Sequence, residues 1–275
     1  HVLKGEVELP VSKRKVTTWA MFTDAEADLW EKSIDYINDG IYYYSSWNGE
    51  YPYDQCTAVD GALTAGGGME YPNVTVIGGA GSSKILQLTT VHEAGHNWFY
   101  GLLGSNERQH AWMDEGVNSY NENRYMRLKH STKDSVRSQL RVFGLPLPGN
   151  LGDLDNAKLL STAYVMNARK RLDQPVDLPA SEYTEINYGA IVYEKTAILL
   201  DYLSAYLGQE TFDRCMHQYF DEWHYKHPMP SDFRKVMETT SGKNLLSAIL
   251  SIIELIVLIN PSLSVDHTLV MGVTI

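Results

Sequence analysis

The stretch VHEAGHNWFYGLLGSNERQHAWMDEGVNSY, from Val91 to Tyr120, predicts two antiparallel helices that share one metal ion. His92 and His96 are four residues apart, so a helix brings both imidazoles to one face, with Cβ atoms about 6 Å apart. Glu115 becomes a third ligand if the turn residues Gly104–Asn106 fold the second helix back on the first. Two histidines and one glutamate form a ligand set of catalytic zinc. The stretch therefore predicts one Zn²⁺ held by His92, His96 and Glu115.

Glu93 places a carboxylate beside these predicted ligands. It lies about 100° around the helix from His92, so it can reach a water at the metal without being aimed at the ion. A carboxylate in this place can act as a general base. Two histidines at this spacing also arise by chance in ordinary helices. The third carboxylate, at a workable distance in a second helix, favours the metal site.

Composition narrows the class of protein. The chain has 275 residues and a net charge of −11, and its longest basic runs, Lys13–Lys15 and Arg169–Arg171, are short. A nucleic-acid-binding protein is expected to carry a basic stripe, so we expect no nucleic-acid partner. Cys56 and Cys215 are the only cysteines, which leaves nitrogen and oxygen as metal ligands. The compartment of this soluble protein stays open between the cytoplasm and a periplasmic or secreted location.

The two ends of the chain differ from its middle. The opening HVLKGEVELP has no signal-type pattern, and we expect it to lie inside a longer protein. Near the other end, the apolar run Leu245–Ile259 is interrupted by Glu254 and is short for a membrane span. We therefore expect no membrane span. Only Glu254 and Asp266 carry a formal charge after Leu245, and we interpret residues 244–275 as a divergent apolar tail.

The order of predicted elements is a small sheet followed by helices, which is the α+β class. Strands are predicted over Gly5–Met21, Gln55–Val59 and Val74–Ile77, and a helix capped by Thr23 and Glu26 runs to about Tyr44. The later helices are predicted by apolar residues that recur every three or four positions. They cover Ile85–Leu102, Met113–Leu128, Ser135–Val142, Tyr188–Leu207, Phe212–Trp223 and Ser231–Thr239.

Four motifs occur in an order known from one enzyme family. They are GGGMEYPN (Gly66–Asn73), HEAGHNW, WMDEG and VYEKTAILLDYL (Val192–Leu203). Together they resemble the zinc aminopeptidases of the aminopeptidase N (membrane alanyl aminopeptidase) family, which includes the bifunctional leukotriene hydrolase. The resemblance spans about residues 16–243 and implies a gluzincin fold, thermolysin-like, with a small mixed sheet and a mainly helical lobe. It implies a peptidase domain over 22–243, with residues 1–21 left from an absent amino-terminal β domain.

The resemblance also implies how a peptide is held. The family's Gly-x-Met-Glu-Asn motif matches Gly67, Gly68, Met69 and Glu70, but this chain has Tyr71 in the place of the asparagine. In the family the motif's glutamate binds the free α-ammonium of the substrate, which assigns that role to Glu70. Glycines allow an extended peptide to approach the backbone closely, like an added strand.

Two further roles follow from the same resemblance. The tyrosine of the family's Tyr-Glu-Lys motif donates a hydrogen bond to the oxyanion, which points to Tyr193, and Tyr188 competes for this role. Glu122 is either an outer carboxylate behind the ligands or a solvated side chain. The implied function is a zinc-dependent aminopeptidase acting on peptides with a free N-terminus. The alternatives are a zinc endopeptidase or epoxide hydrolase at the same site, or a zinc-binding but inactive fragment.

Overall fold

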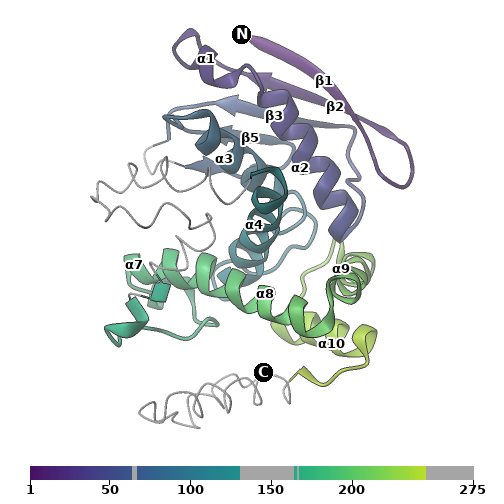
Figure 1. Cartoon of the computed structure of the whole chain (residues 1–275), viewed down its shortest axis with the longest axis vertical. Helices are drawn as coiled ribbons and strands as arrows, with labels where there is room; N and C mark the ends of the chain where they lie inside the picture. Colours follow the sequence, from purple (N-terminus) through teal and green to yellow (C-terminus); the bar gives the residue numbers. More distant parts are fainter. Residues whose placement is uncertain (64–66, 131–163, 166, 246–275) are drawn as a thin grey trace.

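A five-stranded mixed sheet forms the amino-terminal part of the chain (Figure 1). The computed structural model describes residues 1–63, 67–130, 164–165 and 167–245. The strands are arranged in the order β1-β2-β3-β5-β4. Two of its four pairings are parallel, β2 with β3 and β3 with β5. The outer strands β1 and β4 are antiparallel to their neighbours. Their bounds are Val2–Glu8 (β1), Lys15–Met21 (β2), Gln55–Asp60 (β3), Gly68–Met69 (β4) and Val74–Ile77 (β5).

The first strand prediction needs a correction. Gly5–Met21 is not one strand but parts of two, because the chain turns back after β1 and the backbone N–H of Leu9 donates to the carbonyl of Arg14 over 2.9 Å. Both strands belong to the same sheet as β3. The assignment of residues 1–21 to an absent domain, and the bounds of the peptidase domain, stay predictions.

The first predicted helix is broken into three pieces. They are a 3₁₀ turn η1 over Asp24–Glu26, a short α1 over Ala27–Trp30 and α2 over Ser33–Asn48. The predicted capping box is wrong, because Thr23 makes no side-chain cap and its hydroxyl donates instead to Asp60 Oδ2 over 2.6 Å. The break follows Trp30, whose carbonyl accepts a hydrogen bond from the Ser33 hydroxyl over 2.6 Å.

The first helix of the metal motif, α3, packs against both α2 and the second helix, α4. α3 spans Ser83–Gly95, with Ser82 as its N-cap, and α4 spans Val117–Lys129 after a π-helical turn η2 over Trp112–Gly116. The prediction of the second helix is confirmed, but α3 ends at Gly95 and not at Leu102. Beyond it the chain bends through Tyr100, which has a left-handed φ of 89°.

A glycine fixes the distance between these helices. A Cβ at Gly95 would collide with Asn118 on α4 and Tyr44 on α2. Glycine therefore allows the close packing that brings the histidines of α3 near η2. The hydroxyl of Tyr44 donates to Asn118 Oδ1 over 2.9 Å, and the amide of Asn118 donates to the carbonyl of His92 over 2.7 Å.

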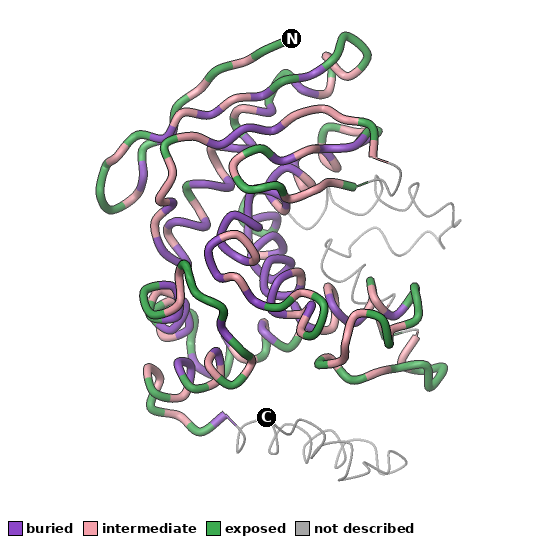
Figure 2. Tube along the Cα trace, turned by 180° about the vertical axis from the view of Figure 1, so that it is seen from behind, coloured by how far each residue is buried: buried purple, intermediate pink, exposed green. Residues whose placement is uncertain are grey.

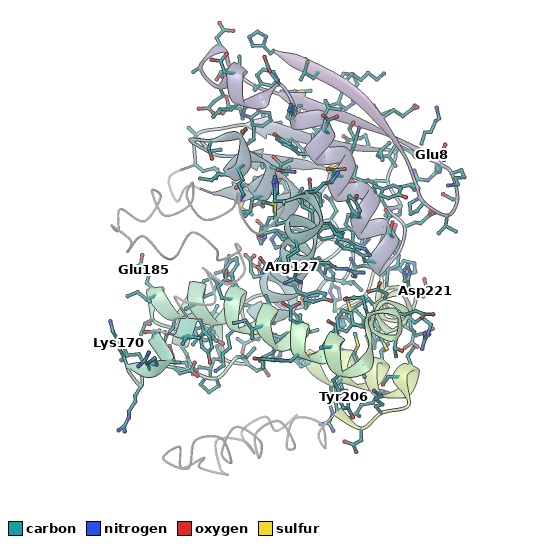
Figure 3. All side chains as sticks on the ribbon, viewed as in Figure 1. Glu8, Arg127, Lys170, Glu185, Tyr206 and Asp221 are labelled. Carbon is teal, nitrogen blue, oxygen red and sulfur yellow. The ribbon has the colours of Figure 1, made fainter. Side chains whose placement is uncertain are left out.

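The remaining helices form a second layer below α4 (Figure 1). They are η4 (Ala180–Glu182), α7 (Glu185–Asn187), the π-helical η5 (Tyr188–Lys195), α8 (Thr196–Leu207), α9 (Gln209–Trp223) and α10 (Pro230–Ser241). A bidentate pair from Arg127 to Asp201, at 2.8 and 2.9 Å, joins α4 to α8 (Figure 3). The predicted helix Ser135–Val142 lies outside the described residues, as does the tail beyond Leu245.

The buried residues run continuously from the sheet into the helical lobe (Figure 2). One apolar cluster includes Val16 on β2, Ile37 on α2, Trp98 after α3 and Phe212 on α9. Leu245, near the start of the predicted tail, is also part of this core. The metal motif therefore sits where the sheet layer and the helical layer share one core.

Candidate metal centre and active site

Three ligand atoms converge between α3 and η2. His92 Nε2 lies 3.1 Å from His96 Nε2 and 3.1 Å from Glu115 Oε2, and His96 Nε2 lies 3.2 Å from the same carboxylate oxygen. Zinc holds such ligands at about 2.0–2.2 Å in tetrahedral geometry, which places neighbouring ligand atoms about 3.3 Å apart. The triangle of His92, His96 and Glu115 thus has the size of one face of a zinc tetrahedron. The predicted ligand set is brought together by the fold.

Each histidine has a carboxylate behind it. His92 Nδ1 lies 2.8 Å from Glu122 Oε2, and His96 Nδ1 lies 2.6 Å from Asp114 Oδ1. Both carboxylates are buried. Such outer partners fix the ring orientation of metal ligands. Of the two readings of Glu122, the structure favours the outer carboxylate, whereas Asp114 was missed although it directly precedes Glu115.

Neighbouring carboxylates favour the protonated form of both histidines. Burial lowers the pKa of His92, but hydrogen bonds with Glu115 and Glu122 outweigh burial and raise it to about 10. Burial acts in the same way on His96, and the charge of Asp114 and hydrogen bonds with Asp114 and Glu115 raise its pKa well above the ordinary value. Burial raises the pKa of Glu115, but hydrogen bonds with both histidines lower it below its ordinary value. Binding of a metal to these rings therefore has to displace protons.

Glu93 faces the site with a free oxygen. It is 6% exposed, and its Oε2 has no hydrogen-bond partner among the residues that the structure describes. Burial raises the pKa of this carboxyl to about 7, and the neighbouring histidines oppose that shift. A Cβ at Gly68 would collide with the Glu93 side chain. Glycine at position 68 therefore lets β4 pass directly over the buried carboxylate.

The two candidate tyrosines lie next to each other on η5. The ring of Tyr193 stacks on His92 with 6.0 Å between centroids, and Tyr188 is 6.0 Å from Tyr193. Burial, the charge of Glu115 and a hydrogen bond with Glu115 raise the pKa of Tyr193 far above its ordinary value. Burial and Glu115 raise the pKa of Tyr188 to about 12. Both hydroxyls are therefore protonated at neutral pH, and Tyr193 is the one whose ring stacks on a ligand.

The Gly-x-Met-Glu motif forms an edge of the sheet. β4, Gly68–Met69, pairs on one side with β5, with Gly68 opposite Ile77 and Met69 opposite Val76. Gly67 has a left-handed φ of 69°, which glycine adopts without strain. Glu70 follows directly after β4 and is half-buried, while Tyr71, which replaces the family's asparagine, is 56% exposed. The motif thus places an extended edge next to Glu93.

Comparison with known proteins decides the family. The Peptidase family M1 domain matches residues 32–252, most of the chain. The chain belongs to peptidase family M1. It is 28% identical over 159 residues to aminopeptidase M1-C of Oryza sativa subsp. japonica, covering 57% of this chain and 16% of that protein. It is 26% identical over 194 residues to leucine aminopeptidase 2-1 of Meyerozyma guilliermondii, covering 66% of this chain and 30% of that protein.

Solved M1 structures share the fold. An M1 zinc metallopeptidase from Deinococcus radiodurans aligns with a TM-score of 0.59 at 17% identity, covering 87% of this chain and 48% of that one. Aminopeptidase A of Legionella pneumophila, in complex with aspartic acid, aligns with a TM-score of 0.62 at 14% identity, covering 89% of this chain and 27% of that one. The predicted α+β fold of the M1 catalytic domain is confirmed. The chain spans less than a third of the curated relatives named above.

Within this M1 domain, the described residues contain no helix that is both long enough and apolar enough to cross a membrane.

Besides the three zinc ligands, the described residues contain a second group of side chains close enough together to hold a metal ion. It consists of Glu70, Glu107 and Asp114, which offer oxygens within 4.8 Å of one another. Sequence reasoning missed Glu107. Its position in the turn GSNERQ gives no periodic or motif signal, and only the folded chain brings it to Glu70.

The proton-bearing histidines predict a steep pH dependence of zinc binding to the M1 site. A ring whose metal-free pKa lies above the working pH must release its proton before zinc can bind, so zinc affinity should rise with pH. The expected gain is about tenfold per pH unit for each displaced proton, up to about pH 10 for His92. Competition with a chelator of known affinity between about pH 6 and about pH 8 measures it. A constant affinity over that window would show that both rings are already neutral.

Proposed function

We propose that this chain is the catalytic domain of a zinc-dependent aminopeptidase that removes N-terminal residues from peptides. The observation that carries the proposal is the convergence of three ligand atoms 3.1–3.2 Å apart beside the unpaired carboxylate oxygen of Glu93. The relatives named as aminopeptidases support the same activity. The neighbouring β4 edge and Glu70 support peptides with a free N-terminus as the substrates.

In this proposal His92, His96 and Glu115 hold one Zn²⁺. When bound, zinc supplies Lewis-acid chemistry, which lowers the pKa of water and polarises a carbonyl. Glu93 acts as the general base that takes a proton from the attacking water, and it then returns this proton to the leaving amine. The Glu93 side chain is buried against Gly68, and its Oε2 has no hydrogen-bond partner among the described residues, which leaves that oxygen available as a base.

Tyr193 and the β4 edge orient the reacting bond. The hydroxyl of Tyr193, which the raised pKa keeps protonated, donates a hydrogen bond to the oxyanion as the peptide carbonyl becomes tetrahedral. A peptide that lies along Gly67, Gly68 and Met69 as an added strand presents its first carbonyl towards Glu93. Glu70, directly after this strand, then pairs with the terminal ammonium. This pairing places the first peptide bond of the substrate at the reacting centre, so that one residue is removed at a time.

Replacing Glu70 by Ala should lower kcat/KM on free-amine substrates by about ten- to a hundred-fold. A charge-assisted pair in a partly desolvated cleft contributes about 1.5–3 kcal/mol, which corresponds to that loss. Zinc content should not change, because Glu70 is outside the ligand set. Aminoacyl chromogenic substrates and metal analysis measure both quantities.

A matched control for this variant is Glu31→Ala, which removes an exposed glutamate next to α1. It should leave kcat/KM at the unmutated value. If Glu70→Ala behaves like Glu31→Ala, Glu70 does not bind the substrate's ammonium. The register must then be fixed by other residues.

The proposal as a whole is tested by metal analysis combined with a panel of aminoacyl chromogenic substrates. We expect one zinc per chain and turnover that disappears when a chelator removes the metal. If the protein binds one equivalent of zinc but turns over none of the free-amine substrates, it is a zinc-binding domain without the proposed activity. Turnover that survives complete removal of the metal would refute the metal mechanism.

A further inference from the structure

One buried amide side chain joins the end of the metal helix to the turn that follows Glu70. Asn97, the residue after His96, is 2% exposed. Its Nδ2 donates a hydrogen bond to the carbonyl of Ala94 on α3 over 2.9 Å, and its Oδ1 accepts one from the backbone N–H of Asn73 over 2.9 Å. A carbonyl only accepts and an N–H only donates, so both ends of the amide are matched.

The turn from Tyr71 to Val74 connects Glu70 to β5. It is closed by the backbone N–H of Val74, which donates to the carbonyl of Tyr71 over 3.1 Å. Asn73 has a left-handed φ of 65° within this turn, a conformation that asparagine adopts more often than most residues. The contact to Asn97 therefore holds the turn at the residue whose backbone conformation is the least common.

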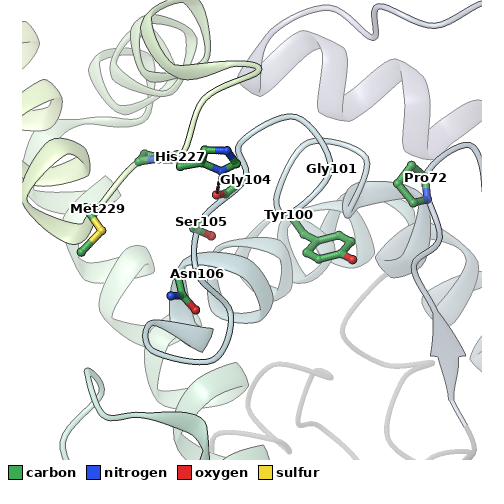
Figure 4. Close-up of a pocket in the computed structure, with 9 residues that line it drawn as sticks. Pro72, Tyr100, Gly101, Gly104, Ser105, Asn106, His227 and Met229 are labelled. Carbon is green, nitrogen blue, oxygen red and sulfur yellow. Dashed lines mark hydrogen bonds between the residues drawn. The ribbon is translucent and has the colours of Figure 1, made fainter.

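The outer side of this turn faces open space. Pro72 lines a cavity of about 670 Å³, whose wall also contains Tyr100 and Gly101 from the bend after Asn97 (Figure 4). Tyr71 and Pro72 are both exposed. The place of the turn therefore depends on the contacts made by its inner side.

A tyrosine that precedes β3 supports the same inner side. The hydroxyl of Tyr51 lies 2.9 Å from Asn73 Oδ1. Tyr51 is fully buried, and its ring packs on Trp98, the residue after Asn97, with 5.2 Å between centroids. The carbonyl of Asn73 accepts a hydrogen bond from the backbone N–H of Thr57 over 2.8 Å. Asn73 is thus held through its N–H, its carbonyl and its side chain.

Glu70 lies between two points that are held in place. On one side, the hydroxyl of Thr75 donates to the carbonyl of Met69, the last residue of β4, over 3.0 Å. On the other side, the turn is attached to Asn97. Because Asn97 directly follows the ligand His96, this attachment relates the position of Glu70 to that of the zinc ligands.

We propose that Asn97 is a positioning residue that fixes the distance between Glu70 and the zinc centre. The inference rests on the proposed function and deepens it, because the ammonium and the first carbonyl of a peptide are a fixed number of bonds apart. A misplacement of about 1 Å can lower a rate about a hundredfold. Without the Asn97 amide the turn can move towards the cavity, and Glu70 then binds the ammonium less well. Asn97 acts through Glu70 and does not itself contact the substrate.

The test is a double-mutant cycle on kcat/KM for an alanyl chromogenic substrate. Asn97→Ala should lower kcat/KM about tenfold in the unmutated background, since the amine contact is misplaced but not removed. Because the loss acts through Glu70, adding Asn97→Ala to Glu70→Ala should change kcat/KM by less than about twofold. The same tenfold loss in both backgrounds would mean that the two residues act independently, and the inference would be overturned.

Binding without turnover gives a readout that a general loss of stability does not reproduce. Zinc-loaded Glu93→Gln protein is titrated by calorimetry with a tripeptide of alanine and with the same tripeptide N-acetylated. Adding Asn97→Ala should weaken binding of the free-amine peptide about tenfold and leave binding of the acetylated peptide unchanged. Equal weakening of both peptides would show that Asn97 shapes the cleft as a whole, which contradicts the inference.

A second variant reaches the turn from its other contact. Tyr51→Phe removes the hydroxyl at Asn73 and keeps the buried ring. It should cause a smaller loss of kcat/KM than Asn97→Ala, and this loss should also disappear in the Glu70→Ala background. If Asn97→Ala does not fold, this cycle decides, and an additive loss in it overturns the inference.

Asn48→Ala is the matched control for a buried asparagine at a helix end. Asn48 is 1% exposed, and its Nδ2 donates to the carbonyl of Tyr44 at the end of α2 over 3.3 Å. Its replacement removes a similar contact away from the turn. It should leave the affinity for both peptides unchanged.

Zinc analysis separates the remaining outcomes. We expect one zinc per chain and an unchanged zinc affinity in Asn97→Ala, because the amide holds the turn and not a ligand. If Asn97→Ala loses zinc, the residue supports His96, and the inference fails while the proposed function stands. If Glu70→Ala itself leaves kcat/KM unchanged, the ammonium role of Glu70 in the proposed function is refuted.

Discussion

Replacing Glu93 by Gln is expected to lower kcat by about 10²–10⁴ while the protein keeps one zinc ion. The loss follows because glutamine cannot take a proton from the attacking water. The ligands His92, His96 and Glu115 are untouched, so zinc content should equal that of the unmutated protein. Parallel metal analysis and kinetics on an aminoacyl chromogenic substrate measure the two quantities on the same sample.

The control for this variant is Glu185→Gln, an exposed glutamate on α7 (Figure 3). It removes the same charge from the surface and should leave kcat unchanged. If Glu93→Gln loses its zinc, Glu93 is a ligand, and the assignment of the base is wrong. A variant that keeps both zinc and full activity would show that another group takes the proton.

Replacing Tyr193 by Phe is expected to lower kcat by about 10²–10³ with little change in KM. The substitution removes one hydroxyl, whose hydrogen bond to the oxyanion forms mainly in the transition state. Loss of a single donor to the oxyanion lowers kcat by about this factor. The phenylalanine ring keeps the stacking on His92, so the ligand should keep its orientation. Circular dichroism and zinc analysis check that the fold and the metal are retained.

Tyr188→Phe is the matched control, since it makes the same chemical change on the same helix, beside Tyr193. It should reduce kcat much less. Tyr193 is preferred because its ring stacks on the ligand His92 with 6.0 Å between centroids, whereas Tyr188 lies against Tyr193. A large loss in Tyr188→Phe together with none in Tyr193→Phe would transfer the role to Tyr188.

The zinc ligands could be predicted from sequence because their placement depends on local geometry. Helical spacing puts His92 and His96 on one face, and a second helix after a turn returns Glu115 to them. The α+β order was also readable, since β-branched runs precede amphipathic helices. The observed triangle of ligand atoms, 3.1–3.2 Å on each side, adds the distances that sequence cannot supply.

Other features depend on contacts between distant segments. α3 ends at Gly95, and the backbone that follows makes turn hydrogen bonds before it reaches the left-handed φ of Tyr100. The two residues of β4 are too few for a periodic signal, yet they form the sheet edge beside Glu93. Glu107 lies in a turn and reaches Glu70 only when β4 and η2 are packed around α3. No local pattern predicts these contacts.

We propose that the zinc centre acts on peptides with a free amine. The most direct measurement compares hydrolysis of one aminoacyl chromogenic substrate by the zinc-loaded protein with hydrolysis of its N-acetylated form. We expect turnover of the free-amine substrate, loss of that turnover on chelation, and no measurable turnover of the acetylated form. Equal hydrolysis of the two substrates would contradict the aminopeptidase assignment, whatever the metal content.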